Sequence, residues 1–187
     1  MTDIKGMKVA ILIADGFEQV EMVKPRQALD QAGAKTSIVS PSEGQVRAWN
    51  FTEWGDKFPV DIPLQQARPE DFDALHLPGG VINPDKLRMI PEAVKFAKAF
   101  FDAGKPVSVI CHGPWTVIET GYAKGRRMAS WPSLKTDLKN AGAEWVDEAA
   151  VRDGNMVSSR NPDDIPAFNK AVIELFSQAK TQEKKAA

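Results

Sequence analysis

The centre of the chain reads Pro106-Val107-Ser108-Val109-Ile110-Cys111-His112-Gly113-Pro114. The residues before the cysteine are mostly apolar and β-branched, which is typical of a buried strand. His112, Gly113 and Pro114 end that strand, and a helical pattern begins at Trp115. A strand that stops on a nucleophilic residue and turns sharply into a helix predicts a nucleophile elbow, with Cys111 as the nucleophile.

Cys111 is the only cysteine of the chain. A lone cysteine is most often an inert, buried small side chain, and a histidine elsewhere in the chain makes it only a candidate nucleophile. Its position favours a site, because sites form at the carboxyl ends of strands in open parallel sheets. A helix that starts beneath the sulfur offers free N–H groups and the positive end of its dipole. We therefore expect a Cys111 thiol with a lowered pKa that is the sole site of alkylation.

The composition narrows the class of protein. The 187 residues suffice for one domain with a buried core. The 24 basic and 25 acidic side chains give a net charge of −1. The sequence therefore lacks the excess of positive charge that is typical of proteins that bind nucleic acid or anionic membranes. One cysteine permits no internal disulfide, which indicates the cytoplasm. No apolar run approaches the ~20 residues of a membrane span, and the first residues lack the apolar stretch of a signal peptide. We expect no metal and no cofactor.

Strand and helix patterns alternate along the chain. The predicted strands are residues 7–13, 35–40, 74–77, the run before Cys111, 144–146 and 155–159. The predicted helices are residues 17–32, 91–103, 115–119, 134–141 and 165–178. This alternation predicts an α/β fold, a mostly parallel sheet with helices on both faces, in one domain.

Three local features qualify this pattern. Pro25 should kink or split the first helix. Residues 46–60 carry aromatic side chains among glycine and charge, and favour a hairpin or an irregular insertion. Residues 181–187 are polar and predict a frayed tail after a core of about 7–178.

Three predicted strands end on residues that carry chemistry. These ends are Asp15-Gly16-Phe17-Glu18, Pro78-Gly79-Gly80 and Cys111-His112-Gly113. If the strands are neighbours, their carboxyl ends lie at one edge of the sheet, and Glu18, Gly80 and Cys111 meet there.

Each of these residues has a chemical role in the predicted site. His112 takes or gives a proton if the turn brings its ring back over the sulfur, because adjacent residues of a regular helix face different ways. Gly80 lacks a Cβ and lets the backbone approach the reacting carbon, and N–H groups of Gly79, Gly80 and His112 are candidates for an oxyanion hole. Glu18 hydrogen-bonds to the sulfur as an acid or moves a proton, with a raised pKa.

Plainer interpretations stay open for each residue. Glu18 can be an ordinary acid of the first helical turn, where the helix dipole favours negative charge. Pro78-Gly79-Gly80 can be only a tight turn, and His112 can be only a residue that starts a helix. His76 has apolar neighbours and is interpreted as a core histidine. The aromatic residues Trp49, Phe51 and Trp54 favour a subunit interface or a cleft wall over the core.

The chain resembles the PfpI family of intracellular cysteine peptidases, in the superfamily of the Parkinson-associated protein deglycase and the class I glutamine amidotransferases. The resemblance covers about residues 7–178. It rests on the segments Asp15 to Glu21, Phe72 to Gly80, Val109 to Pro114, Trp145-Val146-Asp147 and Ser158-Ser159-Arg160. It implies a flavodoxin-like sandwich and homodimers that build hexamers. It also implies Cys111 as the nucleophile, His112 as its partner and Glu18 as the acid beside the sulfur.

The resemblance further implies a site shared between subunits. In the peptidase branch a glutamate that follows the Pro-Gly-Gly turn of the neighbouring subunit completes the triad. The matching residue is Asp85, which is one methylene shorter and follows a loop that is one residue longer. Asp85 is therefore the candidate that orients His112 of the partner.

Three functions follow from this reading. As a hydrolase for stress response or quality control, the protein would cleave peptides through an acyl-enzyme. Alternatively, the thiolate would attack glyoxal-type carbonyls or their adducts with proteins, including a glyoxalase III-like conversion of methylglyoxal. A third function is a non-catalytic redox sensor, in which Cys111 oxidises to sulfenic and then sulfinic acid because no second cysteine resolves the sulfenate.

Overall fold

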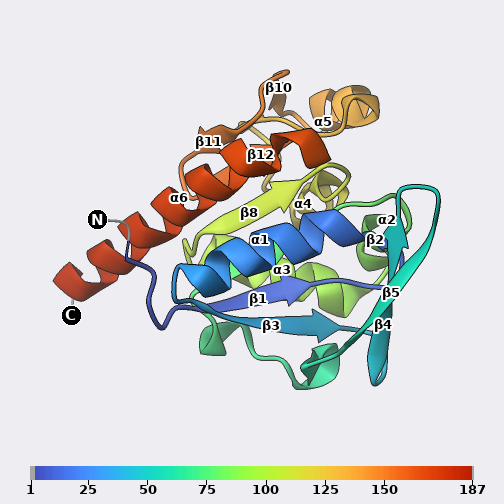
Figure 1. Ribbon diagram of the computed structural model, residues 1–187. Helices are drawn as coiled ribbons and strands as arrows, with labels where there is room; N and C mark the ends of the chain where they lie inside the picture. The colour runs from blue at the N-terminus through green and yellow to red at the C-terminus, as the bar shows by residue number, and fades with distance from the viewer. Residues whose placement is uncertain (1–2, 187) are drawn as a thin grey trace.

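A computed structural model describes residues 3–186, and the centre of the fold is one sheet of seven strands (Figure 1). In spatial order its strands are β11 (Val151–Asp153), β12 (Met156–Ser159), β8 (Val107–Ile110), β7 (Ala74–Leu77), β1 (Lys8–Leu12), β3 (Lys35–Ser40) and β6 (Ile62–Pro63). Neighbouring strands are parallel except β11, which is antiparallel to β12. Counted along the chain, the parallel strands β3, β1, β7, β8 and β12 follow the order 2-1-3-4-5, which is the flavodoxin-like order.

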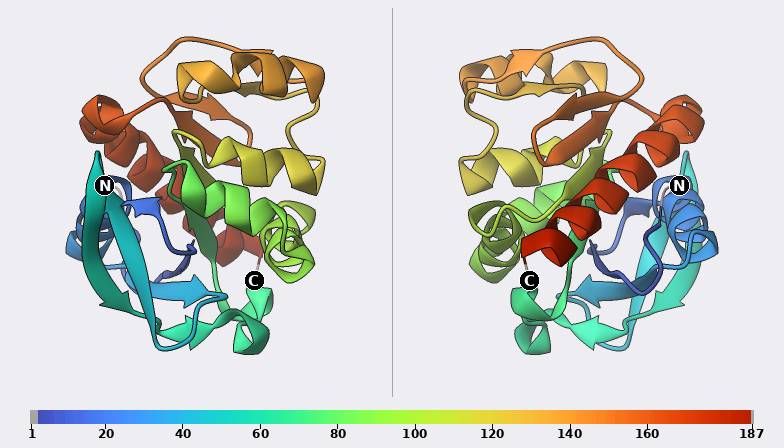
Figure 2. Two further views of the ribbon diagram at one scale, coloured as in Figure 1. Left: turned by 90° about the vertical axis from the view of Figure 1, so that its right-hand side faces the viewer. Right: turned by 90° about the vertical axis from the view of Figure 1, so that its left-hand side faces the viewer.

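Helices cover both faces of this sheet (Figure 2). They are α1 (Gln19–Gln31), α2 (Ile82–Arg88), α3 (Pro91–Asp102), α4 (Pro114–Thr120), α5 (Lys135–Asn140) and α6 (Ile165–Ala186). α1 and α6 lie on one face, and α3 and α4 lie on the other. Along β1, Val9 belongs to the apolar cluster of the first face, whereas Ala10 and Leu12 belong to that of the second. The sheet is therefore buried on both sides, as predicted.

A smaller three-stranded sheet stands beyond the carboxyl ends of the central strands. It consists of β2 (Phe17–Glu18), β4 (Gln45–Asn50) and β5 (Glu53–Pro59). β4 and β5 form the predicted hairpin, which rises at the right of Figure 1 beyond the arrowheads of β1 and β3. The remaining short elements are β9 (Arg127–Met128), β10 (Glu144–Trp145), η1 (Leu64–Gln66), η2 (Pro69–Asp71), η3 (Pro132–Leu134) and η4 (Pro162–Asp164).

The structure corrects three sequence-based expectations. Pro25 lies inside a single helix, α1, and does not split it. The sequence did not predict α2, whose Pro84 falls at its third position, where a missing N–H breaks no helical bond. The predicted end of the last helix at residue 178 is also wrong, because α6 continues to Ala186. The frayed tail over residues 181–187 stays a prediction, and residue 187 lies outside the described part.

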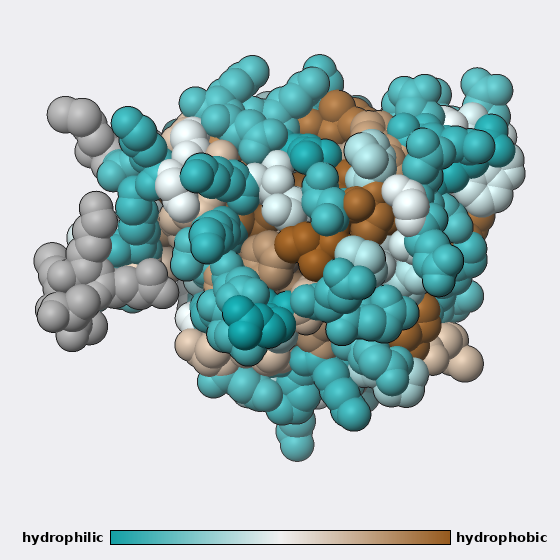
Figure 3. Space-filling view, turned by 90° about the horizontal axis from the view of Figure 1, so that it is seen from below, coloured by the Kyte–Doolittle hydropathy of each residue, from teal (hydrophilic) through white to brown (hydrophobic). Residues whose placement is uncertain are grey.

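The surface carries isolated apolar areas. The face turned downward in Figure 1 shows apolar side chains near its centre with hydrophilic side chains around them (Figure 3). Over residues 3–186, no helix combines the length and apolar character that crossing a membrane requires.

Candidate active site

Cys111 forms the predicted elbow. Its φ of 63° lies in the left-handed region, which costs a non-glycine residue roughly 1–2 kcal/mol. Three backbone hydrogen bonds hold the turn: Cys111 N donates to Ser159 O at 3.0 Å, Trp131 N donates to Cys111 O at 2.9 Å, and Gly113 N donates to Ile110 O at 2.9 Å. The surrounding strands therefore maintain a strained residue at the end of β8, as nucleophile elbows require.

The turn also brings the His112 ring back to the sulfur, as the prediction required. His112 Nδ1 lies 3.1 Å from Cys111 Sγ. Trp131 stacks on the imidazole with 5.9 Å between centroids, and Trp115 packs edge-on at 5.2 Å. Burial in this aromatic setting lowers the His112 pKa to about 4, so the ring is neutral at physiological pH. Among the described residues, the hydrogen bond recorded for this ring is the one to Cys111, and none to a carboxylate is found.

The acid beside the sulfur is Glu21, and the assignment of that role to Glu18 was wrong. Glu21 is fully buried, and its carboxyl group lies close enough to the Cys111 side chain for the two groups to shift each other's pKa. It sits on the stripe Glu21, Pro25, Leu29, which α1 turns to the interior. The sequence contained a signal for this assignment. Glu21 lies four and eight residues before the apolar residues Pro25 and Leu29, a spacing that puts it on the buried face of a helix, whereas Glu18 precedes the helix.

Pro25 and His76 fix the place of Glu21. Because proline has no N–H, the Glu21 carbonyl loses its helical donor. His76 Nε2 donates to that carbonyl at 2.9 Å, and His76 Nδ1 lies 3.0 Å from Ser108 Oγ. His76 is fully buried, as interpreted from the sequence, and burial lowers its pKa to about 4. A neutral histidine thus links α1 to β8 directly beneath the acid.

Glu18 faces the same cavity but has another partner. Its carboxylate accepts a hydrogen bond from Phe51 N at 3.2 Å, at the tip of the β4–β5 hairpin. Glu18 precedes α1 without a side-chain capping bond, so it is no helix cap either. Burial raises its pKa. β2 carries Glu18 and pairs with β4, and this pairing directs the residue to the hairpin.

Burial and like charge decide the protonation of the Cys111–Glu21 pair. Desolvation raises the Glu21 pKa to about 8. Burial first and the Glu21 carboxylate second raise the pKa of the Cys111 thiol well above its usual range. The expected lowered thiol pKa was therefore wrong: α4 has only seven residues, and its dipole does not outweigh desolvation. Burial, the first cause for both groups, therefore favours the neutral form of the sulfur and of the acid in the resting site.

The glycine turn after β7 supplies the backbone donors. The N–H groups of Gly80 and His112 lie near the Cys111 sulfur, where they oppose the rise of its thiol pKa, so they are placed beside the position where an oxyanion would form. Gly79 N instead donates to Glu21 Oε2 at 2.9 Å, which assigns Gly79 to the acid and not to the oxyanion hole. A Cβ at Gly80 would lie 2.6 Å from Gly16 O, and the φ of Gly80 is 75°. Only glycine suits this position.

Asn83 holds this turn in place, and sequence reasoning did not identify it. The side chain is fully buried in the first turn of α2. Its Nδ2 donates to Pro78 O at 3.0 Å and to Gly79 O at 3.1 Å, while its Oδ1 accepts from Ala14 N at 2.7 Å. Asn83 therefore ties the ends of β1 and β7 together at the reactive edge.

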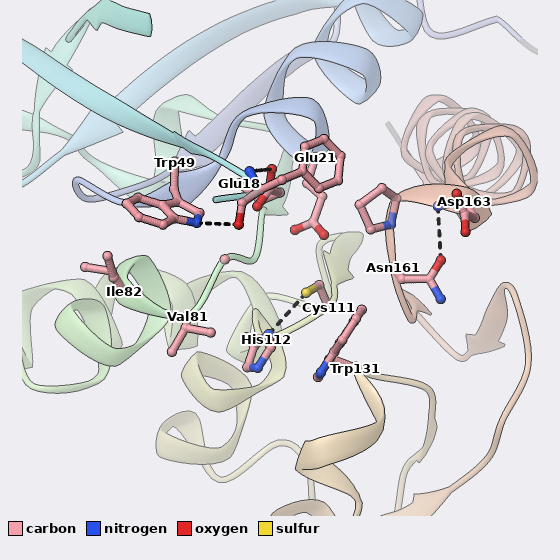
Figure 4. A pocket seen from close by; sticks show the side chains of 13 residues that line it. Glu18, Glu21, Trp49, Val81, Ile82, Cys111, His112, Trp131, Asn161 and Asp163 are labelled. Atoms are coloured by element: carbon pink, nitrogen blue, oxygen red, sulfur yellow. Dashed lines mark hydrogen bonds between the residues drawn. The ribbon is translucent and has the colours of Figure 1, made fainter. Parts of the chain in front are cut away.

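These groups line one cavity of about 600 Å³ (Figure 4). Its walls are Glu18, Glu21, Trp49, Phe51, Gly80, Val81, Ile82, Cys111, His112, Trp131, Asn161, Pro162 and Asp163. Glu21 and His112 approach the sulfur from two sides in Figure 4. The three predicted strand ends thus converge, and Trp49 and Phe51 form part of a cleft wall. Asp85 does not line the cavity of its own chain and is exposed on α2.

Comparisons with known proteins agree with this geometry. The model of the DJ-1/PfpI family matches residues 7–175. A deglycase from Pyrococcus abyssi is 41% identical over 170 residues, 91% of this chain and 99% of the relative. The structure of Drosophila melanogaster DJ-1beta has a TM-score of 0.82 at 26% identity and covers 95% of each chain. A two-domain protein from Anabaena variabilis with DJ-1/ThiJ/PfpI-like and ferritin-like domains gives 0.83 at 33% identity; the match covers 89% of this chain and 47% of that protein.

Proposed function

This chain belongs to the DJ-1/PfpI family, and on that premise we propose that it is an enzyme whose Cys111 adds to reactive carbonyl compounds, acting as a deglycase on glyoxal adducts in the cytoplasm. The observation that carries the proposal is a cysteine sulfur at the floor of an open cavity with a proton carrier beside it. His112 Nδ1 lies 3.1 Å from the sulfur, and the backbone N–H groups of Gly80 and His112 lie close to it.

Neutral addition suits this site. As Cys111 Sγ bonds to an aldehyde carbon, the C=O π bond breaks, and His112 moves the thiol proton to the new alkoxide oxygen. The product is a hemithioacetal with no net change of charge. N–H groups of Gly80 and His112 stabilise the oxygen while it is negative.

The later steps need only water. A hydrogen moves from the former aldehyde carbon to the neighbouring ketone carbon, with protonated Glu21 placed to exchange protons there, and a thioester results. Water hydrolyses the thioester, which frees the acid and restores the thiol. The balance for methylglyoxal is methylglyoxal plus water to lactic acid. Where the aldehyde arrives as an amine adduct, the thiol displaces the amine, which leaves with a proton.

The same geometry favours a carbonyl substrate over a peptide. An amide is a weaker electrophile than an aldehyde, and its amine must leave with a proton from an imidazolium. The low pKa of His112, which burial causes, makes an imidazolium costly, and no carboxylate in residues 3–186 bonds to the ring to stabilise it.

The proposal is tested with methylglyoxal and a methylglyoxal-modified peptide, by measuring lactate and recovered peptide. We expect wild-type turnover and none from Cys111→Ala, because the sulfur forms every covalent intermediate. An unstructured protein serves as the parallel peptidase substrate. Cleavage of that protein without lactate release would replace the proposal by peptide hydrolysis, and peroxide-sensitive Cys111 without any turnover would replace it by redox sensing.

We further propose that the working site is shared between two subunits of a homodimer, which can assemble to a hexamer. Two observations support this arrangement: His112 has no acidic partner within the described part of its own chain, and Asp85 is exposed at the start of α2, outside its own cavity. In a twofold dimer, Asp85 of each subunit would orient His112 of the other.

Mixed dimers test the shared site. Cys111→Ala and Asp85→Asn subunits should each be nearly inactive alone, since one lacks the nucleophile and the other the orienting acid. In a mixed dimer one site carries both changes and the other carries neither. Random mixing makes about half of the dimers mixed, so roughly a quarter of wild-type activity should return. Full activity of Asp85→Asn alone, or no recovery after subunit exchange confirmed by mass spectrometry, would contradict the shared site.

A further inference from the structure

Exposed apolar side chains gather at the mouth of the Cys111 cavity. In residues 3–186 the exposed large hydrophobic side chains are Phe51 at 63%, Trp54 at 44%, Val81 at 53%, Met89 at 78% and Trp131 at 40%. Phe51, Val81 and Trp131 all line the cavity that holds the nucleophile. Apolar side chains left in water around a concave site are typical of a binding surface for an apolar ligand.

The backbones of two of these residues are hydrogen-bonded to other residues of the cavity. Phe51 has a left-handed φ of 56°; its N–H donates to Glu18 Oε1 at 3.2 Å, and its carbonyl accepts from Trp49 Nε1 at 2.9 Å. Trp131 N donates to Cys111 O at 2.9 Å, and its ring stacks on His112. The Trp131 ring and the Phe51 backbone are therefore positioned before a ligand arrives, which lowers the entropic cost of binding.

The charge of the cavity selects against anions. Its walls include the carboxyl groups of Glu18 and Asp163 together with the neutral carboxyl group of Glu21, and none of its lining residues is lysine or arginine. The volume of about 600 Å³ leaves space beyond a three-carbon aldehyde. A carboxylate or phosphate on the substrate would meet acidic groups and no counter-charge there.

We propose that Phe51, Val81 and Trp131 form an apolar subsite for a bulky uncharged substituent, aryl or branched alkyl, next to the carbonyl that Cys111 attacks. This substrate class rests on the proposed carbonyl chemistry and specifies it. The substituent lies between the Phe51 and Trp131 rings, and the aldehyde carbon then reaches the sulfur. Val81 closes the side of the subsite toward α2.

Substrate selectivity tests the subsite. The ratio of kcat/KM for phenylglyoxal to that for methylglyoxal should exceed about tenfold in the wild type, and 4-carboxyphenylglyoxal should be about tenfold poorer than phenylglyoxal. Phe51→Asn keeps a residue that tolerates positive φ but removes the ring, and Trp131→Ala removes the opposite wall; each should lower the phenylglyoxal ratio about tenfold. Met89→Ala removes an exposed apolar side chain outside the cavity and should leave the ratio unchanged.

A binding measurement separates the subsite from the chemistry. Mandelamide, a neutral aryl analogue of the product, should protect Cys111 from iodoacetamide better than lactamide does, and both ring variants should remove this difference. Cys111-dependent turnover with an unchanged ratio in both variants would overturn the subsite and leave the proposed function standing. If no turnover is found but mandelamide still protects Cys111 better than lactamide does, the subsite stands and the proposed function is overturned. If the assembly of both ring variants changes its molar mass in solution while the ratio of kcat/KM values stays the same, the two side chains belong to a subunit interface, and the proposal is overturned.

Discussion

Replacing Gly79 with alanine should lower kcat/KM by more than about 100-fold and destabilise the protein by ~1–3 kcal/mol. A Cβ at position 79 would lie 2.6 Å from Cys111 Cβ, 2.6 Å from Glu21 Oε2 and 2.8 Å from Ile110 O. The first two contacts are to the nucleophile and the acid, so relieving them must displace one or both. Activity is measured as lactate formed from methylglyoxal, and stability by urea unfolding.

Gly104→Ala provides the matched control for this change. Gly104 has a φ of 67°, and an added Cβ would have no neighbour within 4 Å. The Gly104→Ala variant should therefore lose roughly 1–2 kcal/mol of stability, which is the cost of a side chain at a positive φ, and it should keep its activity. Equal losses of activity in the two variants would mean that the effect at Gly79 comes from general destabilisation and not from crowding at the sulfur.

The free energy of unfolding should be largest near pH 6.5. His76 and His112 have folded pKa values of about 4 against 6.5 in a free chain. The unfolded state therefore binds more protons below pH 6.5, and stability falls as the pH drops. Glu21 has a folded pKa of about 8 against 4.5. Its folded state binds the extra proton between these values, so stability falls as the pH rises.

The balance of these groups sets the position of the maximum. Below pH 6.5 the two histidines outweigh Glu21, although His112 lies nearer to solvent and contributes less, and the raised pKa of the partly buried Glu18 opposes them as well. From pH 6.5 to 8 Glu21 dominates, and its expected contribution to the loss is about 2 kcal/mol. Urea unfolding between pH 5 and 8.5 measures this curve.

Glu21→Gln should remove the alkaline loss and retain the acidic one, because glutamine carries no ionisable group. Glu92→Gln, at an exposed position in the first turn of α3, should leave the maximum where it is. A wild-type stability that stays level from pH 6.5 to 8 would show that Glu21 ionises as freely in the fold as in the unfolded chain.

The sequence determined the fold class and the place of the proposed nucleophile. Apolar, β-branched runs and helical spacing separate strands from helices, and a strand that ends in Cys111-His112-Gly113 can continue into a helix only through a sharp turn. The carboxyl ends of parallel strands meet at one edge of a sheet, so the sequence predicted that Glu18, Gly80 and Cys111 converge on one cavity on the condition that their strands are neighbours, and the structure meets that condition.

The tertiary structure decided which acid meets the sulfur and how the site is protonated. Glu18 and Glu21 are both carboxylates near the start of α1, and only the pairing of β2 with β4 sends the first to Phe51 and leaves the second at Cys111. A pKa depends on desolvation and on charges brought close by folding, which no local pattern contains. The bond from His76 to the carbonyl freed by Pro25 joins residues 55 positions apart, and such long-range partners become identifiable only when the chain is folded.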